Sequence, residues 1–182
     1  MHGCIAHGEG SYHRNSAETW PEAGGTELTG RLIKILLDGE ALHRLSALQE
    51  ADRTQAVADL EAENEFSPLS HPELEGILHL SIQEGRMVFD IRDAAETPLM
   101  AIVLAMGPFK MLIKDYQMLL DSYAGAIAEG REAKIQAIDM GRRGLHNEGA
   151  ELMQARLEGK VVIDFPTARR LFTLVCALHQ KL

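Results

Sequence analysis

Short runs of alternating or continuous apolar residues between positions 31 and 106 predict a β-sheet. Residues 31–37 read R-L-I-K-I-L-L and end at an Asp-Gly turn. Residues 77–82 and 86–92 flank a Glu-Gly turn, as in a hairpin, and residues 99–106 are apolar throughout. Because the connections between the last three runs are short, we expect a small antiparallel sheet of about three to four strands.

Helical spacing of the apolar positions predicts one helix between the first two of these runs and further helices after the last one. Ser46 and Gln49 form a capping box that would begin a helix running to about residue 65. Apolar residues recur with helical periodicity over residues 109–127 and again over residues 133–157. The second of these stretches is either one continuous helix or two helices broken near Gly144.

The C-terminal region predicts a short extended link followed by a central helix. Residues 160–164 read K-V-V-I-D and suggest an edge strand. Residues 165–167 begin a last helix that is apolar on nearly every side from residue 171 to residue 178. A helix of this kind is expected in the middle of the core.

These elements indicate one domain and one extension. Residues 1–27 show no periodic apolar pattern and predict a disordered N-terminal extension. Residues 28–182 predict a single α+β domain, in which the small antiparallel sheet packs against a helical C-terminal half. Cys4 and Cys176 lie in unlike environments, so we expect no disulfide and a cytoplasmic protein. No apolar run is long enough to span a bilayer, so no membrane partner is expected.

Charge is unevenly distributed along the chain. The formal net charge of −9 argues against a nucleic-acid partner, because neutralising phosphates requires clustered Lys and Arg. Residues 131–182 nevertheless hold nine Lys+Arg against six Asp+Glu. This basic third favours an anionic small molecule or an acidic protein surface as the partner.

Residues 138–149, I-D-M-G-R-R-G-L-H-N-E-G, are the strongest candidate for a functional site. Glycine costs about 1 kcal/mol relative to alanine in a helix, so folding alone seldom favours three glycines among so many charges. Arg169 and Arg170 near the start of the last helix add further positive charge. The candidate ligand-binding residues are Arg142, Arg143, His146, Asn147, Glu148, Arg169 and Arg170.

Two sources of compensating negative charge remain open for these arginines. Within the chain, the candidates are Asp139, Glu148, Glu151 and Asp164, which would form an internal ion-pair network. The alternative is an external phosphate or carboxylate, which the N-terminus of the last helix would also attract.

His146 has two interpretations. It is a candidate general acid or base oriented by Asp139 or Glu148, because histidine titrates near neutrality. Otherwise it is a helix-surface side chain hydrogen-bonded to a carbonyl. The spacing of His146 and Glu148 does not place two metal ligands on one helical face, so no metal is expected. The sequence leaves the cofactor, if any, unknown.

Several strings resemble one known family. These are residues 138–149, T-A-R-R-L-F-T-L at 167–174, L-H-L-S-I at 78–82 and V-F-D-I-R at 88–92. They are similar to the alphaproteobacterial uncharacterised protein family 0262 over roughly residues 30–179. The resemblance implies no activity, cofactor or catalytic residue.

The sequence therefore favours a non-enzymatic binding or regulatory protein with an Arg/His-rich site for an anionic ligand or acidic partner. One alternative is an enzyme that uses His146 on a phosphorylated or carboxylated small molecule. Another is a homo-oligomeric module in which the glycine-containing helix packs against the same helix of a second copy.

Overall fold

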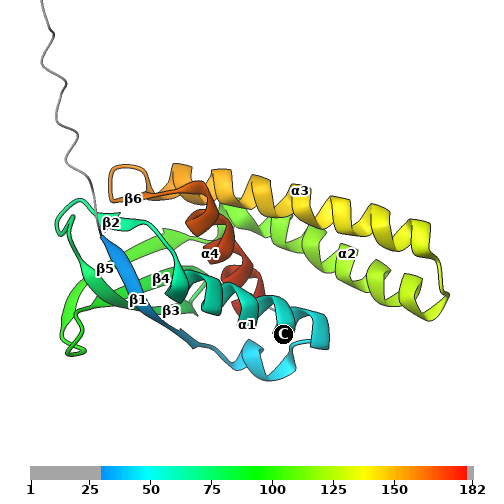
Figure 1. Ribbon diagram of the computed structural model, residues 1–182, viewed down its shortest axis with the longest axis horizontal. Coiled ribbons are helices and arrows are strands. Elements are labelled where there is room, and N and C mark those ends of the chain that lie inside the picture. Colours follow the sequence, from blue (N-terminus) through cyan, green and yellow to red (C-terminus); the bar gives the residue numbers. More distant parts are fainter. Residues whose placement is uncertain (1–29, 180–182) are drawn as a thin grey trace, which may run out of the picture.

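The computed structural model describes residues 30–179. The extension expected over residues 1–27 lies outside the described residues. Within them, the chain is an α+β protein, as the sequence predicted, with a four-stranded sheet at one end and helices over the rest (Figure 1).

The main sheet has the strand order β1-β3-β4-β5. Strands β3 (Glu75–Gln83), β4 (Arg86–Arg92) and β5 (Pro98–Ala105) form the expected antiparallel meander. Strand β1 (Arg31–Asp38) instead pairs parallel with β3, so the sheet is mixed rather than wholly antiparallel. The reason is the helical crossover between the two strands, which returns the chain to the same end of the sheet.

A second, two-stranded sheet joins segments that are far apart in sequence. Strand β2 (Phe66–Pro68) pairs antiparallel with β6 (Val161–Ile163), which is the predicted extended link. The sequence did not predict β2, because a three-residue strand carries no periodic signal.

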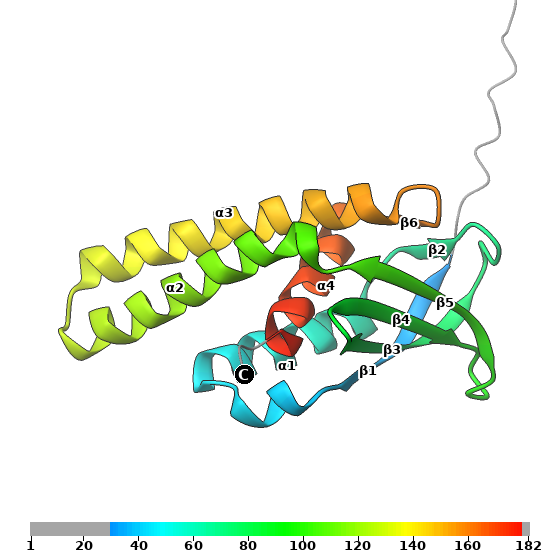
Figure 2. The same cartoon turned by 180° about the vertical axis from the view of Figure 1, so that it is seen from behind.

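The helices are α1 (Ala47–Ala62), α2 (Lys110–Ala128), α3 (Glu132–Leu157) and α4 (Phe165–Leu178), with 3-10 turns η1 (Glu40–Arg44) and η2 (Gly107–Phe109). Helix α3 runs unbroken through Gly144, which decides between the two interpretations of this stretch. Helices α2 and α3 lie side by side, and their connected ends project away from the sheet (Figure 2).

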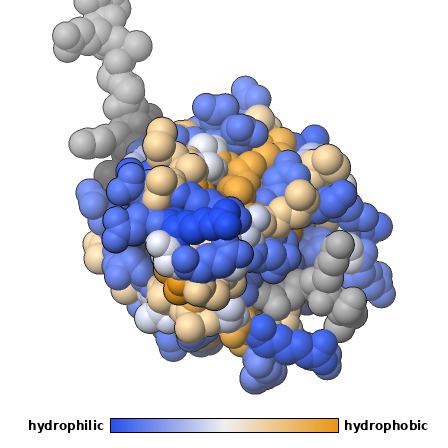
Figure 3. All heavy atoms as spheres, turned by 90° about the vertical axis from the view of Figure 1, so that its right-hand side faces the viewer, coloured by the Kyte–Doolittle hydropathy of each residue, from blue (hydrophilic) through white to orange (hydrophobic). Residues whose placement is uncertain are grey.

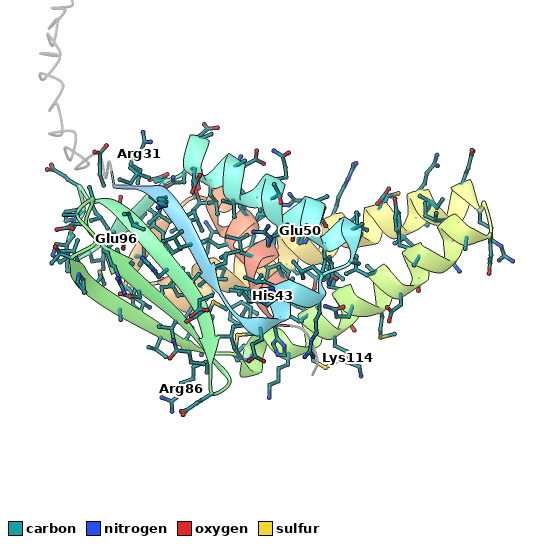
Figure 4. All side chains as sticks on the ribbon, turned by 90° about the horizontal axis from the view of Figure 1, so that it is seen from below. Arg31, His43, Glu50, Arg86, Glu96 and Lys114 are labelled. Carbon is teal, nitrogen blue, oxygen red and sulfur yellow. The ribbon has the colours of Figure 1, made fainter. Side chains whose placement is uncertain are left out.

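Helix α4 lies at the centre of the molecule, as predicted. It is enclosed by the sheet, α1 and α3, and most of its residues are buried (Figure 4). Phe172 is fully buried, and its ring lies against the backbone of Gly149 in α3. A Cβ atom at position 149 would be 2.3 Å from that ring, so glycine is what allows α3 and α4 to approach this closely.

Helix α1 is held in place by hydrogen bonds at both ends. The predicted capping box of Ser46 and Gln49 is present at its start. At its end, Asn64 accepts a hydrogen bond from Leu32 N and donates one to Leu32 O in β1, both at 2.8 Å. Glu65 N donates to Thr167 Oγ1 of α4 at 3.0 Å. These bonds fix which face of α1 is presented to α3 and α4.

The surface at the end of the molecule where α2 and α3 are connected is mainly hydrophilic, with hydrophobic side chains in small patches (Figure 3). Over residues 30–179, no helix combines the length and apolar character needed to cross a membrane.

Candidate functional site

A polar pocket of about 320 Å³ lies where α1, α3 and α4 meet. Helices α1 and α3 each contribute one face, with residues at i, i+3, i+4 and i+7, and α4 packs against both. Among the lining residues that the structure describes, Ala56 is the only apolar one. The full lining is Asp52, Gln55, Ala56, Asp59, Asp139, Arg142, Arg143, His146, Arg169, Arg170 and Thr173.

Five of the predicted ligand-binding residues meet in this pocket, and two do not line it. Arg142, Arg143 and His146 come from α3, and Arg169 and Arg170 from α4. The two that do not line it are Asn147, which contacts Arg169, and Glu148, which lies on another face of α3.

Arg142 is paired within the protein. Its guanidinium donates to Asp52, and its Nη1 lies 3.2 Å from Asp139 Oδ1. Tyr116 Oη donates to the same oxygen of Asp52 at 3.1 Å. Because the Arg142 side chain is only 13% exposed, these carboxylates offset the cost of burying its charge. This part of the site is an internal ion-pair network, which was one of the two alternatives for the arginines in the sequence analysis.

Arg170 is also partly satisfied by the chain. Its Nη1 donates to the carbonyl of Glu63 at 2.8 Å, and its Nε lies 3.8 Å from Asp59 Oδ2. Asp59 in turn accepts a hydrogen bond from Gln55 at 2.7 Å. Arg170 is therefore tied to the second half of α1.

Arg143 and Arg169 differ from the other two arginines. Among the described residues, neither has a carboxylate within salt-bridge distance. The Nε of Arg169 donates to Asn147 Oδ1 at 3.1 Å, which orients the guanidinium without neutralising it. The pocket thus combines two paired guanidinium groups with two that carry unmatched positive charge.

His146 is buried, so the interpretation of it as a helix-surface side chain is wrong. It is 7% exposed, and its ring contacts those of Tyr116 and Phe172 at centroid distances of 5.2 and 6.0 Å. Burial, assisted by the positive charge of Arg169, lowers the pKa of His146 to about 4. Its Nε2 has no hydrogen-bond partner within residues 30–179.

The structure does not join His146 to the carboxylates proposed to orient it. Asp139 is engaged with Arg142. Glu148 lines a separate groove between α2 and α3, where Gly141 and Gly144 also lie. In the described part of the chain, no hydrogen bond links His146 to Asp139 or Glu148.

The main site residues that were not predicted from the sequence are the acids of α1, Asp52 and Asp59. Of the four carboxylates considered as partners, only Asp139 pairs with a pocket arginine, while Asp164 caps α4 through Thr167 N at 2.9 Å. Asp52 and Asp59 supply the remaining pairing. Their signal is present in the sequence, because Asp52, Gln55 and Asp59 recur on one face of the predicted helix.

Metal and thiol chemistry have no visible support at the described positions. Residues 30–179 contain no group of three or more His, Cys, Asp or Glu side chains arranged to hold a metal ion. Cys176 is a buried free cysteine, and burial raises the pKa of its thiol, which disfavours the reactive thiolate.

The fold and pocket together define an α+β protein with an arginine-rich polar site between three helices. The chain belongs to the uncharacterised protein family UPF0262, whose sequence model matches residues 29–181.

Relatives in this family cover nearly the whole chain. The UPF0262 protein of Acidiphilium cryptum is 64% identical over 158 residues, which are 87% of this chain and 98% of the relative. A UPF0262 protein of Granulibacter bethesdensis is 65% identical, covering 84% and 91% of the two chains. One from Rhodospirillum rubrum is 45% identical, covering 88% and 99%. No solved structure matches this chain.

Proposed function

We propose that the protein binds a small anionic molecule in the pocket between α1, α3 and α4, and that it acts as a binding or regulatory protein. The observation that carries this proposal is the pair Arg143 and Arg169, which have no carboxylate partner among the described residues. Beside them lies the buried His146, whose Nε2 also lacks a partner there.

The other interpretations have less support. A general acid or base needs an orienting partner, and His146 has neither Asp139 nor Glu148 in that role. An acidic protein surface would require a broad convex or flat patch, whereas the arginines line a concave pocket of about 320 Å³. We place the protein in the cytoplasm, because the free thiol of Cys176 fits a reducing compartment.

A thermal melt in phosphate tests the proposal. Inorganic phosphate at millimolar concentration should raise the melting temperature of the wild type, because it binds only the folded state. Arg169→Gln should melt near the wild type without phosphate and gain little from it. Arg156→Gln, an exposed substitution on α3 away from the pocket, is the matched control and should respond as the wild type does.

Ionic strength must be constant in all arms, so that binding is separated from charge screening. An equal phosphate response in the wild type and Arg169→Gln would overturn the proposal. A large loss of stability in ligand-free Arg169→Gln would also count against it, since that result would show that Arg169 is needed by the fold itself.

Self-association is a second candidate, supported by a different surface. Gly144 is exposed with open space around it, and Met118 in the same α2–α3 groove is 57% exposed. Gly149, by contrast, packs against Phe172 inside the fold. Light scattering should detect a dimer in the wild type and a monomer in Gly144→Glu if two copies pack through this groove. A wild-type monomer would exclude it.

A further inference from the structure

The charges that line the pocket restrict the ligand to a narrower chemical class than anions in general. Four arginines face three aspartates, and two of those aspartates share Arg142. Arg143 and Arg169 are therefore the groups left to meet external negative charge. They come from different helices, so a single ligand group must accept hydrogen bonds from two directions.

A phosphate group fits this arrangement better than a carboxylate does. A carboxylate has two coplanar oxygens, which one arginine can satisfy in a bidentate pair. A phosphomonoester carries about −1.5 to −2 charge at neutral pH and three acceptor oxygens in a tetrahedral arrangement. It can therefore accept from Arg143 and Arg169 and still offer an oxygen to a third donor.

A candidate third donor lies in the wall of the pocket, which His146 lines. His146 Nε2 is buried and unpartnered among the described residues, and so is Arg142 Nε. A neutral imidazole carries one N–H, which can be placed on Nε2. Leaving a buried polar atom unsatisfied is unfavourable, so a ligand oxygen that accepts a hydrogen bond from it strengthens binding.

The acidic side of the pocket limits the rest of the ligand. Asp52, Asp59 and Asp139 would repel a second phosphate, and the whole chain carries a net charge of −9. The same carboxylates, with Gln55, are good acceptors for hydroxyl groups. The modest volume of about 320 Å³ also suits a small molecule rather than a polymer.

We infer that the pocket binds a small hydroxylated phosphomonoester, of the size of a polyol or sugar phosphate. Its phosphate contacts Arg143, Arg169 and His146, and its hydroxyl groups face the aspartates of α1. This inference rests on the proposed anion-binding function and adds the class of ligand.

Isothermal titration calorimetry with a ligand series tests the inference. At constant ionic strength, the probes are glycerol 3-phosphate, glucose 6-phosphate, pyrophosphate, malonate and a short phosphoserine peptide. We expect one of the two phosphomonoesters to bind at least about tenfold more tightly than pyrophosphate, malonate or the peptide. Arg143→Gln and Arg169→Gln should each weaken that binding about tenfold or more, because each removes charge-assisted hydrogen bonds. Arg156→Gln should leave it unchanged.

The outcomes separate this inference from the proposed function. If malonate binds most tightly with the same arginine dependence, the anion site stands and the phosphomonoester assignment is overturned. Tightest binding of pyrophosphate would likewise overturn the assignment, because the aspartates would then not exclude a second phosphate. Tightest binding of the peptide would overturn the small-molecule assignment in favour of a phosphorylated protein segment. If no probe binds, or if Arg143→Gln and Arg169→Gln bind the probes as Arg156→Gln does, both proposals fail.

Discussion

At the scale of single residues, the site is defined by which charges find partners within the fold. Arg142 has two carboxylates, and Arg170 has a carbonyl and a more distant carboxylate. Arg143 and Arg169 have no carboxylate among the described residues, although they line the same pocket. The sequence predicted the arginines and His146 but offered an internal network and an external anion as alternatives. The structure contains the network, and the proposed ligand concerns the arginines outside it.

The buried imidazole of His146 should make folding stability depend on pH. Its pKa falls from 6.5 to about 4 because burial and the charges of Arg169 and Arg142 disfavour the cation, despite the opposing effect of Asp52. Between about pH 4 and pH 6.5, the imidazole of His146 is protonated in the unfolded chain and neutral in the folded protein. The contribution of His146 to stability is therefore fully present above about pH 6.5 and is lost as the pH falls toward 4, by up to about 3 kcal/mol.

Urea denaturation of the wild type and His146→Gln at a series of pH values measures this effect. The variant should lose less free energy of unfolding than the wild type between pH 6.5 and pH 4.5, while acids and His179 contribute equally to both proteins. Parallel pH profiles would mean that the pKa of His146 is the same in the folded and the unfolded chain, and the explanation by burial of a neutral imidazole would be wrong.

At the scale of secondary-structure elements, the local sequence pattern predicted those elements whose formation depends on local sequence. The capping box of α1, the hairpin of β3 and β4, and the buried helix α4 are confirmed, because each has its own pattern of caps, turns or apolar spacing. The parallel pairing of β1 and the short strand β2 depend on contacts between segments distant in sequence, which no local pattern encodes. For the same reason the acids of α1 were not matched to the arginines of α3 and α4.

The crossing of α3 and α4 at Gly149 brings the pocket arginines together. Gly149 lies one turn after His146, and Phe172 lies one turn after Arg169, so this contact sets the spacing of both sides. Gly149→Ala should lower the free energy of unfolding by about 2 kcal/mol or more, because the buried Phe172 ring cannot move away without repacking. The measurement is urea denaturation.

Gly144→Ala is the matched control for that substitution. It lies in the same helix, but an added Cβ atom would meet no described heavy atom within 4 Å. The alanine should therefore stabilise α3 by up to about 1 kcal/mol through helix propensity. Similar effects of the two substitutions would show that the close approach of α3 and α4 does not depend on glycine at position 149.

At the scale of the whole molecule, the α1–α3–α4 pocket and the sheet occupy different parts of the fold. Arg86 and Glu96 lie at opposite ends of the sheet, away from the helices that form the pocket (Figure 4). The pocket is built from residues 52–59, 139–146 and 169–173, and all of them lie inside the segment that matches the family. The proposed binding site therefore lies wholly within the described residues 30–179.

A shortened chain beginning at Leu28 should retain the stability of the full chain. Residues 1–27 lack the apolar periodicity that would offset the entropy of ordering them. We expect a melting temperature within about 2 °C of the full chain, by the usual relation between free energy and melting temperature. A drop of about 5 °C or more in calorimetry would instead show that these residues contribute to the folded domain.

The most direct test of the anion site is an NMR titration that observes each arginine separately. In ¹⁵N-labelled protein, the Nε–Hε signals of Arg143 and Arg169 should shift and saturate as inorganic phosphate is added at constant ionic strength. The signals of Arg156 and Arg53, which do not line the pocket, should remain unchanged. If the signals of Arg143 and Arg169 do not move, or if all arginines shift together without saturation, the pocket is not an anion-binding site.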